Sequence, residues 1–215
     1  MLILLLPQGG SAPSGVDLNA VIDSVLPALG ATSLSDLDWC TQAELLQWAD
    51  DAAKRLASKA GVFVEYDASA TTTIGQAVYA TPTGHIDTIK ATLAKNLRSI
   101  TVAELNSLDS AWQVTPGVPL YFSMDANAPN RITLYPVANA VTTLASIFQK
   151  FPATISVASH MLDMPRPVRG YFAFYVLAEA RRKESDASMP EMADHFDSRV
   201  KMFEQVFEHL YGPSN

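Results

Sequence analysis

The sequence predicts an α+β fold, a helical bundle of about four helices with an inserted antiparallel β-sheet subdomain. Helical periodicity occurs near both ends of the chain, and alternating patterns fill its middle. In addition, a stretch near residues 168–183 is apolar on every side of a helix. Such a helix must be surrounded by protein or lipid, and this one is too short to span a bilayer. It is therefore predicted to be the central helix of the bundle.

The last helix is predicted to begin at a capping box formed by Ser188 and Glu191, with Pro190 in its first turn. Charged residues, Glu204 among them, are predicted to lie mostly away from the apolar stripe. Spacings of four and three place six apolar side chains on that stripe: Met192, Phe196, Val200, Phe203, Phe207 and Leu210.

Two helices are predicted before the insert. The first carries a stripe from Leu18 to Val25 and is stopped by Pro27 and Gly30. The second opens at a capping box of Thr41 and Glu44 and ends at Gly61. The predicted organisation is an N-terminal arm (1–15), the N-terminal helices (16–61), the β insert with one short helix (62–155) and the C-terminal helical pair (156–215).

The insert is recognised by a change of period from 3.6 to 2 after residue 61. Residues 67–73 are small and polar, which predicts a loop or an edge. A capping box of Thr101 and Glu104 predicts the short helix. The last three strands, near residues 120–124, 131–135 and 141–148, are predicted to form an antiparallel meander.

Composition limits the function. The net charge of −7 argues against a general nucleic-acid binder, and the single cysteine, Cys40, cannot form an internal disulfide. There is no Gly-rich phosphate loop, GxSxG, HExxH or cysteine pair, so we expect no catalysis, cofactor or metal. Residues 1–6 are apolar but lack the basic start of a signal peptide, which favours a buried or strand-paired arm, or a sticky arm for a neighbouring subunit.

Two groups of residues leave alternatives open. Arg181 and Arg182 end the central helix, where cations complement the helix dipole; the other interpretation is a salt-bridged contact with another subunit. His160 and Asp163 are three residues apart and would be the catalytic pair of an unrecognised hydrolase. No nucleophile lies near them in the sequence, so the hydrolase is the less favoured function.

The order of features over roughly residues 40–211 resembles the head-to-tail adaptor (connector) proteins of tailed bacteriophages. Residues 1–38 have no place in that pattern. The likeness rests on the helix at 104–112, the segment 117–121, the strand at 132–136, the helix with Leu177 to Arg181, and residues 189–207.

The resemblance implies a structural virion protein that forms a dodecameric homo-oligomeric ring in the phage neck. Such a ring docks under the portal protein, contacts the tail nozzle or other tail proteins, and lines the channel through which genomic DNA passes without specific binding. The protein would occupy the host cytoplasm during assembly and contact no membrane. A tail-completion or stopper protein is the alternative within the virion. The candidate interface residues are Leu2, Ile3, Leu4, Leu5, Leu6, Asp125, Asn127, Asn130, Arg181 and Arg182.

Overall fold

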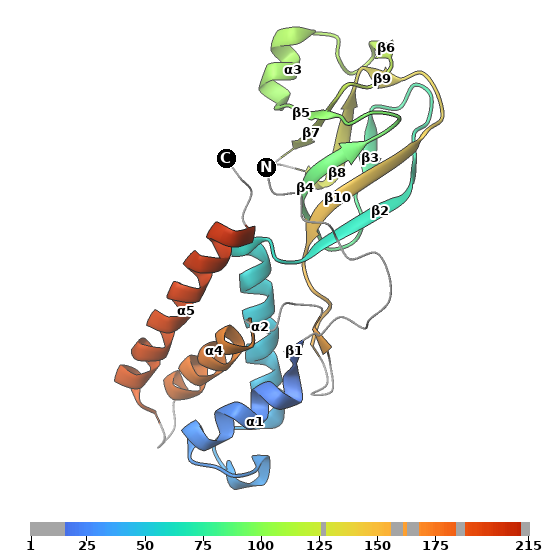
Figure 1. Ribbon diagram of the computed structural model, residues 1–215. Coiled ribbons are helices and arrows are strands. Elements are labelled where there is room, and N and C mark those ends of the chain that lie inside the picture. Colours follow the sequence, from blue (N-terminus) through green and yellow to red (C-terminus); the bar gives the residue numbers. More distant parts are fainter. Residues whose placement is uncertain (1–15, 126–127, 156–160, 163–167, 184–187, 212–215) are drawn as a thin grey trace. The chain divides into compact units, whose positions relative to one another are not determined.

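The computed structural model describes residues 16–125, 128–155, 161–162, 168–183 and 188–211 (Figure 1). These residues form an α+β fold, as predicted. The helices are α1 (Leu18–Leu29), α2 (Gln42–Ala60), α3 (Val102–Leu108), α4 (Arg169–Arg182), α5 (Pro190–Tyr211) and the short 3-10 helix η1 (Leu34–Asp36). The strands are β1 (Val16–Asp17), β2 (Val64–Thr71), β3 (Val78–Ala80), β4 (His85–Thr92), β5 (Arg98–Ser99), β6 (Pro116–Gly117), β7 (Tyr121–Asp125), β8 (Ala128–Tyr135), β9 (Val137–Ala138), β10 (Thr143–Lys150) and β11 (Met161–Leu162).

The chain divides into two compact units. The first comprises residues 1–50 and 155–200, and the second comprises residues 51–154 and 201–215. Helices α2 and α5 therefore contribute residues to both units. In the first unit β1 pairs with β11, with Val16 opposite Leu162. The second unit contains the remaining strands and α3.

Helix α4 is the central helix of the first unit, which confirms the prediction. Every residue from 170 to 181 is buried or partly buried. At its C-terminal end, Arg181 donates a hydrogen bond from Nη2 to the Ala28 carbonyl of α1 at 2.6 Å. The ring of Phe174 stacks on that of Phe196 in α5 at a centroid distance of 6.2 Å. A helix with neighbours on several sides needs no polar face, which explains its all-round apolar sequence.

Local signals position α1. The Asp17 carboxylate accepts the Asn19 N–H at 2.9 Å and caps the helix. Gly30 ends the helix with φ at 85°, a left-handed conformation that favours glycine. Pro27 was predicted to contribute to the stop, but it lies inside the last turn. The turn closes after it because the Pro27 carbonyl accepts the Gly30 N–H at 3.1 Å.

The capping box that opens α2 is confirmed. The Glu44 carboxylate accepts the Thr41 N–H at 2.9 Å, and the Thr41 hydroxyl accepts the Glu44 N–H at 3.3 Å. The same carboxylate also pairs with Lys183 Nζ at 2.7 Å, so the start of α2 is joined to the residue that follows α4. The Lys183 ammonium donates as well to the Trp39 carbonyl at 2.6 Å.

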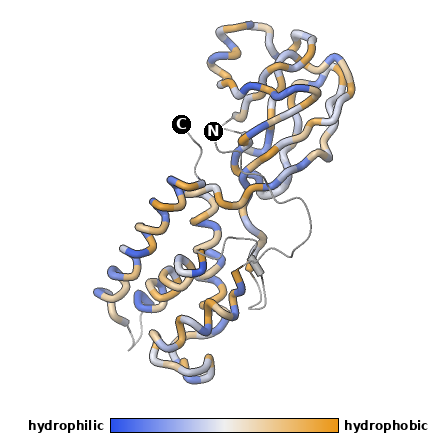
Figure 2. Tube along the Cα trace, in the orientation of Figure 1, coloured by the Kyte–Doolittle hydropathy of each residue, from blue (hydrophilic) through white to orange (hydrophobic). Residues whose placement is uncertain are grey.

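Helix α5 differs from its prediction at its N-cap and at two positions of its apolar stripe. It begins at Pro190, and the Ala193 N–H donates to the Met189 carbonyl, so Met189 occupies the N-cap position in place of Ser188. The Ser188 hydroxyl lies 3.5 Å from the Arg181 carbonyl instead. Figure 2 shows apolar and polar residues alternating along this helix. Of the predicted stripe, Phe196, Val200 and Phe207 are buried and Phe203 is partly buried, whereas Met192 and Leu210 are exposed.

The second unit has a core between two sheets. One sheet has the strand order β2-β10-β4, and the other has the order β3-β8-β7-β5. Strands of both sheets contribute to one buried cluster, which is typical of two sheets packed face to face. Its buried members are Tyr79, Ala91, Leu97, Phe122, Ile132, Leu134 and Leu144.

Most pairs in these two sheets are antiparallel, but β5 pairs with β7 in parallel; β6 and β9 form a separate two-stranded parallel sheet. The predicted meander is wrong in its third strand. Strands β7 and β8 pair as expected, but β10 joins the other sheet between β2 and β4. The free edge of β8 is taken by β3, with Tyr79 opposite Ile132. Residues 67–73 were predicted as a loop or an edge; residues 67–71 belong to β2, which is the edge strand of its sheet, so the second alternative is confirmed there.

Candidate assembly surfaces

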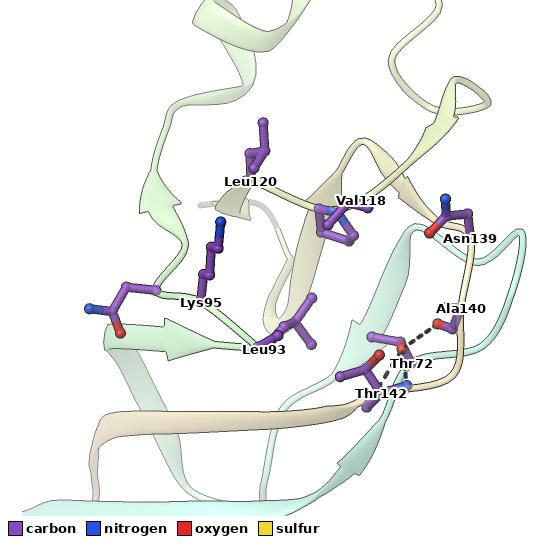
Figure 3. A pocket seen from close by; sticks show the side chains of 11 residues that line it. Thr72, Leu93, Lys95, Val118, Leu120, Asn139, Ala140 and Thr142 are labelled. Atoms are coloured by element: carbon purple, nitrogen blue, oxygen red, sulfur yellow. Dashed lines mark hydrogen bonds between the residues drawn. The ribbon is translucent and has the colours of Figure 1, made fainter.

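Four neighbouring loop segments of the second unit enclose a largely apolar pocket of about 300 Å³ (Figure 3). Its lining comes from residues 93–96 between β4 and β5, residues 118–120 between β6 and β7, residues 139 and 140 after β9, and Thr72 and Thr142. In Figure 3, Leu93 and Lys95 lie on one side of the opening and Val118 and Leu120 on the other.

A buried threonine holds one wall of this pocket. Thr72 is 1% exposed, and its hydroxyl donates to the Ala140 carbonyl at 2.9 Å. The same oxygen accepts the Thr142 N–H at 2.8 Å, and the Thr72 N–H donates to the Thr142 carbonyl at 2.8 Å. These three bonds connect the end of β2 to the loop before β10, so the pocket wall is formed by the fold of the subunit itself.

Backbone hydrogen bonds position the opposite wall. The Leu120 N–H donates to the Tyr135 carbonyl at 2.9 Å, and the Asn139 N–H donates to the Gly117 carbonyl at 3.1 Å. A Cβ on Gly117 would come within 2.9 Å of the Pro136 side chain, so this close approach requires glycine. The hairpin across the opening is closed by the Leu93 N–H, which donates to the Lys95 carbonyl at 3.0 Å.

The rim of the pocket exposes large apolar side chains. Val118 is 66% exposed and Leu120 is 53% exposed, and Val141, beside the lining residues Ala140 and Thr142, is 69% exposed. Among the residues that line the pocket, Lys95 carries the one charge. Grouped apolar side chains around a preformed hollow are typical of a protein–protein contact site.

Of the three predicted interface residues of the insert, the structure describes Asn130 and Asp125. Asn130 is exposed in β8, and its carbonyl accepts the Thr81 N–H at 2.9 Å. Asp125 is the last residue of β7. Asn127 and the arm, Leu2, Ile3, Leu4, Leu5 and Leu6, lie outside the described residues, as do His160 and Asp163.

The cations after α4 make contacts within the subunit. Arg181 is 7% exposed and binds the Ala28 carbonyl. Arg182 is exposed, lies 2.8 Å from Glu179 and 3.5 Å from Asp197, and is the one of the two arginines that a partner can reach. These contacts, together with the position at the C-terminus of α4, are those of cations that stabilise the helix end.

A second exposed apolar surface lies on the C-terminal part of α5. Met202, Val206 and Leu210 recur every four residues, and each is exposed. Next to them Phe203 is partly buried and stacks on Phe207 at 5.9 Å. This part of the helix therefore presents apolar side chains on two faces, one packed and one open.

Within the described ranges no cluster of His, Cys, Asp and Glu could hold a metal, and no helix there is long and apolar enough to cross a bilayer. His85 is buried, stacks on Phe148 at 5.4 Å, and shares a 2.8 Å hydrogen bond with Thr88.

The clearest polar cluster surrounds Asp109, after α3. Its carboxylate accepts the Thr115 hydroxyl at 2.6 Å and the Ala111 N–H at 2.8 Å, and these bonds lower its pKa. Desolvation, followed by the nearby carboxylate, raises the pKa of Tyr135, whose hydroxyl lies 3.4 Å from Asp109. A raised pKa keeps the Tyr135 hydroxyl protonated at neutral pH, and the bonds of Asp109 to Thr115 and Ala111 hold the loop before β6.

Comparison with known proteins decides the family. The model of the SU10 adaptor protein family matches residues 16–210. The chain belongs to the SU10 adaptor protein family. The comparison with curated proteins gave no match.

Membership in this phage adaptor family agrees with the resemblance to phage adaptors and extends it. The likeness was expected to begin near residue 40, but the SU10 adaptor match begins at residue 16. Helix α1, which had no place in the pattern recognised from sequence, is therefore part of the family's domain. Its contact with α4 through Arg181 gives the physical reason, because α1 covers one side of the central helix.

The segment that forms one wall of the pocket was visible in the sequence. Residues 117–121 contribute to the resemblance with the phage adaptors, but no interface role follows from that. A useful signal was the pair Val118 and Leu120, two large apolar residues around Pro119 in a segment without helical periodicity. The other walls come from distant parts of the sequence and gave no local signal.

Proposed function

We propose that this chain is the structural head-to-tail adaptor of a tailed phage, assembled as a dodecameric ring between the portal protein and the tail. The match to the SU10 adaptor family over residues 16–210 carries this proposal. The ring surrounds the channel through which genomic DNA passes, so the protein is a virion component of the neck. The role requires binding between proteins and no catalytic step.

Charge supports the channel role. The chain has 22 acidic and 15 basic residues, a net charge of −7. DNA binders release counterions through many Lys and Arg contacts to phosphate, which hold the DNA in place. An acidic ring repels the backbone and lets DNA slide.

Exposed apolar surfaces support the assembly role. A ring subunit contacts a neighbour on each side and a different protein above and below, so it needs several contact sites on one chain. The pocket rim and the open face of α5 are two such surfaces, each with large apolar side chains that are more than 40% exposed. Protein contacts would remove these side chains from water.

The test is assembly on the portal. The purified chain is mixed with the portal protein of the same phage, and the product is imaged by electron microscopy. A ring of this chain bound to the portal is expected. A portal that stays bare at micromolar concentrations of the chain would refute the proposal. A tail-completion or stopper protein, the alternative, would leave the portal bare but bind once a separate adaptor ring is present.

Surface variants sharpen this test. Leu210→Asp changes the open face of α5, and Met192→Asp places the same charge at another exposed apolar position of the helix. Circular dichroism checks that both variants keep the wild-type helix content. If α5 contributes its C-terminal face to assembly, Leu210→Asp lowers ring formation more than Met192→Asp.

A further inference from the structure

We propose that the pocket of the second unit receives the apolar N-terminal arm, residues 1–6, of a second copy of the chain. The inference rests on the homo-oligomer in the proposed function and names one contact within it. It combines a preformed apolar hollow in the described residues with an apolar segment of the sequence that lies outside them.

The hollow needs an apolar occupant. Its rim presents Val118 and Leu120 to solvent, and Leu93 lies across the opening from them (Figure 3). The bonds of Thr72 and the backbone bonds of the 117–120 segment hold the walls in place, so an occupant does not have to order them first. Preformed sites bind more tightly because less conformational freedom is lost.

The arm matches this site in chemistry. Its residues, Met-Leu-Ile-Leu-Leu-Leu, have no charged or polar side chain, and Pro7 follows them. Flexible apolar side chains adapt to an irregular hollow, and their burial is favourable in water. A run of six apolar residues left in solvent would be an aggregation hazard, so a covering surface is expected.

The arm also has the reach for a second copy. It is connected to the first unit at Val16, which is held by the pairing of β1 with β11. The nine residues from 7 to 15 include glycine, serine and proline, and when extended they span roughly 30 Å. A span on that order is comparable to the diameter of a small domain, and it allows an arm to cross from one subunit to the next.

Charge favours this occupant over an acidic one. Each copy carries a net charge of −7, so two copies repel each other at long range. The arm has no charged side chain, and Lys95 carries the one charge in the pocket lining. A contact between these two segments therefore adds no like-charge pair of carboxylates to the interface.

Disulfide cross-linking between separate chains tests the contact. One chain carries Leu4→Cys and a mass tag, and the other carries Val118→Cys. The matched control is Val114→Cys, which is 74% exposed but does not line the pocket. Cys40 is 3% exposed, so the full-length chain can be used with its natural cysteine in place. Mixtures are oxidised mildly, both alone and with the portal protein, and tagged heterodimers are measured.

We expect roughly tenfold more heterodimer with Val118→Cys than with Val114→Cys, because docking raises the local concentration of the two thiols. Equal yields for the two variants, or no heterodimer in either sample, would overturn the inference. So would a disulfide that forms within single chains carrying both Leu4→Cys and Val118→Cys at high dilution, since the arm would then occupy its own pocket.

The two proposals fail in different ways. If a ring forms on the portal but the pocket-specific heterodimer does not form, the arm contact is refuted and the adaptor function is supported. A pocket-specific heterodimer in the chain alone, with the portal left bare, supports the arm contact and refutes the adaptor function. If the pocket serves a tail protein instead, the ring assembles, the heterodimer is missing, and Val118→Asp weakens binding of the next tail component.

Discussion

The ion pair between Arg55 of α2 and Glu204 of α5 gives the sharpest test of the packing in the second unit. Arg55 Nε lies 2.5 Å from Glu204 Oε1, and Arg55 Nη2 lies 3.2 Å from Oε2. Two parallel bonds of this kind are the strongest arrangement of an arginine and a carboxylate. Glu204 is 5% exposed, whereas the Arg55 side chain is 32% exposed.

Replacing Arg55 by methionine leaves a buried carboxylate without its guanidinium. Breaking a fully buried pair costs about 3–5 kcal/mol. Arg55 is partly open to water, which screens the pair, so we expect a lower cost of about 2 kcal/mol. For a chain of this size that loss corresponds to a decrease in Tm of about 4–8 °C. Methionine keeps the length of the aliphatic stem, which limits the loss of packing.

Urea denaturation followed by the helical circular dichroism signal measures this cost. Arg55→Met, Glu204→Met and the double variant form a thermodynamic cycle. The double variant should regain more than half of the stability that Arg55→Met loses, because it leaves no buried charge. Arg182→Met is the matched control in an exposed pair and should cost less than about 1 kcal/mol. An Arg55→Met variant as stable as this control, or a double variant as unstable as the sum of the singles, would refute the reasoning.

Three further predictions concern single sites. The hydrogen bond from Lys183, followed by that from Thr41, lowers the pKa of Glu44 to about 2, below its usual 4.5. The resulting stability is present above about pH 4.5 and is lost as the pH falls towards about 2. Lys183→Met should therefore lower the free energy of unfolding by about 1 kcal/mol near pH 7, a value discounted for exposure, and by less near pH 3. Denaturation curves at the two pH values measure this difference. Burial raises the pKa of Cys40 to about 11, so a chromogenic thiol reagent should react with the native chain far more slowly than with the unfolded chain, and equal rates would contradict this. Gly61 has φ at 59° and faces a side chain of β10, so Gly61→Ala should lower the free energy of unfolding by about 2 kcal/mol, more than Gly30→Ala, where φ is 85° and a new Cβ meets open space.

The sequence by itself determined the local elements. The capping boxes at Thr41 and Thr101 form as predicted, because each bonds to a glutamate three residues away and needs no distant partner. Helix α4 was recognised, and its central place was inferred, from its all-round apolar surface. The α+β class followed from the change between a helical period and an alternating one.

Tertiary structure decided which distant segments meet. Strand β10 has an alternating pattern, but that pattern does not indicate which strands pair with it. It was expected to pair with β8, and it pairs with β2 on one side and β4 on the other. Glu204 was predicted to lie away from the buried stripe, but it is buried and pairs with Arg55. The local pattern could not show this pair, because Arg55 is 149 residues earlier. The pocket likewise exists only where the ends of β2, β4 and β9 and the segment before β7 come together. Hydrogen-bond ladders, buried ion pairs and pockets are made by residues far apart in the chain, and a local pattern carries no information about their partners.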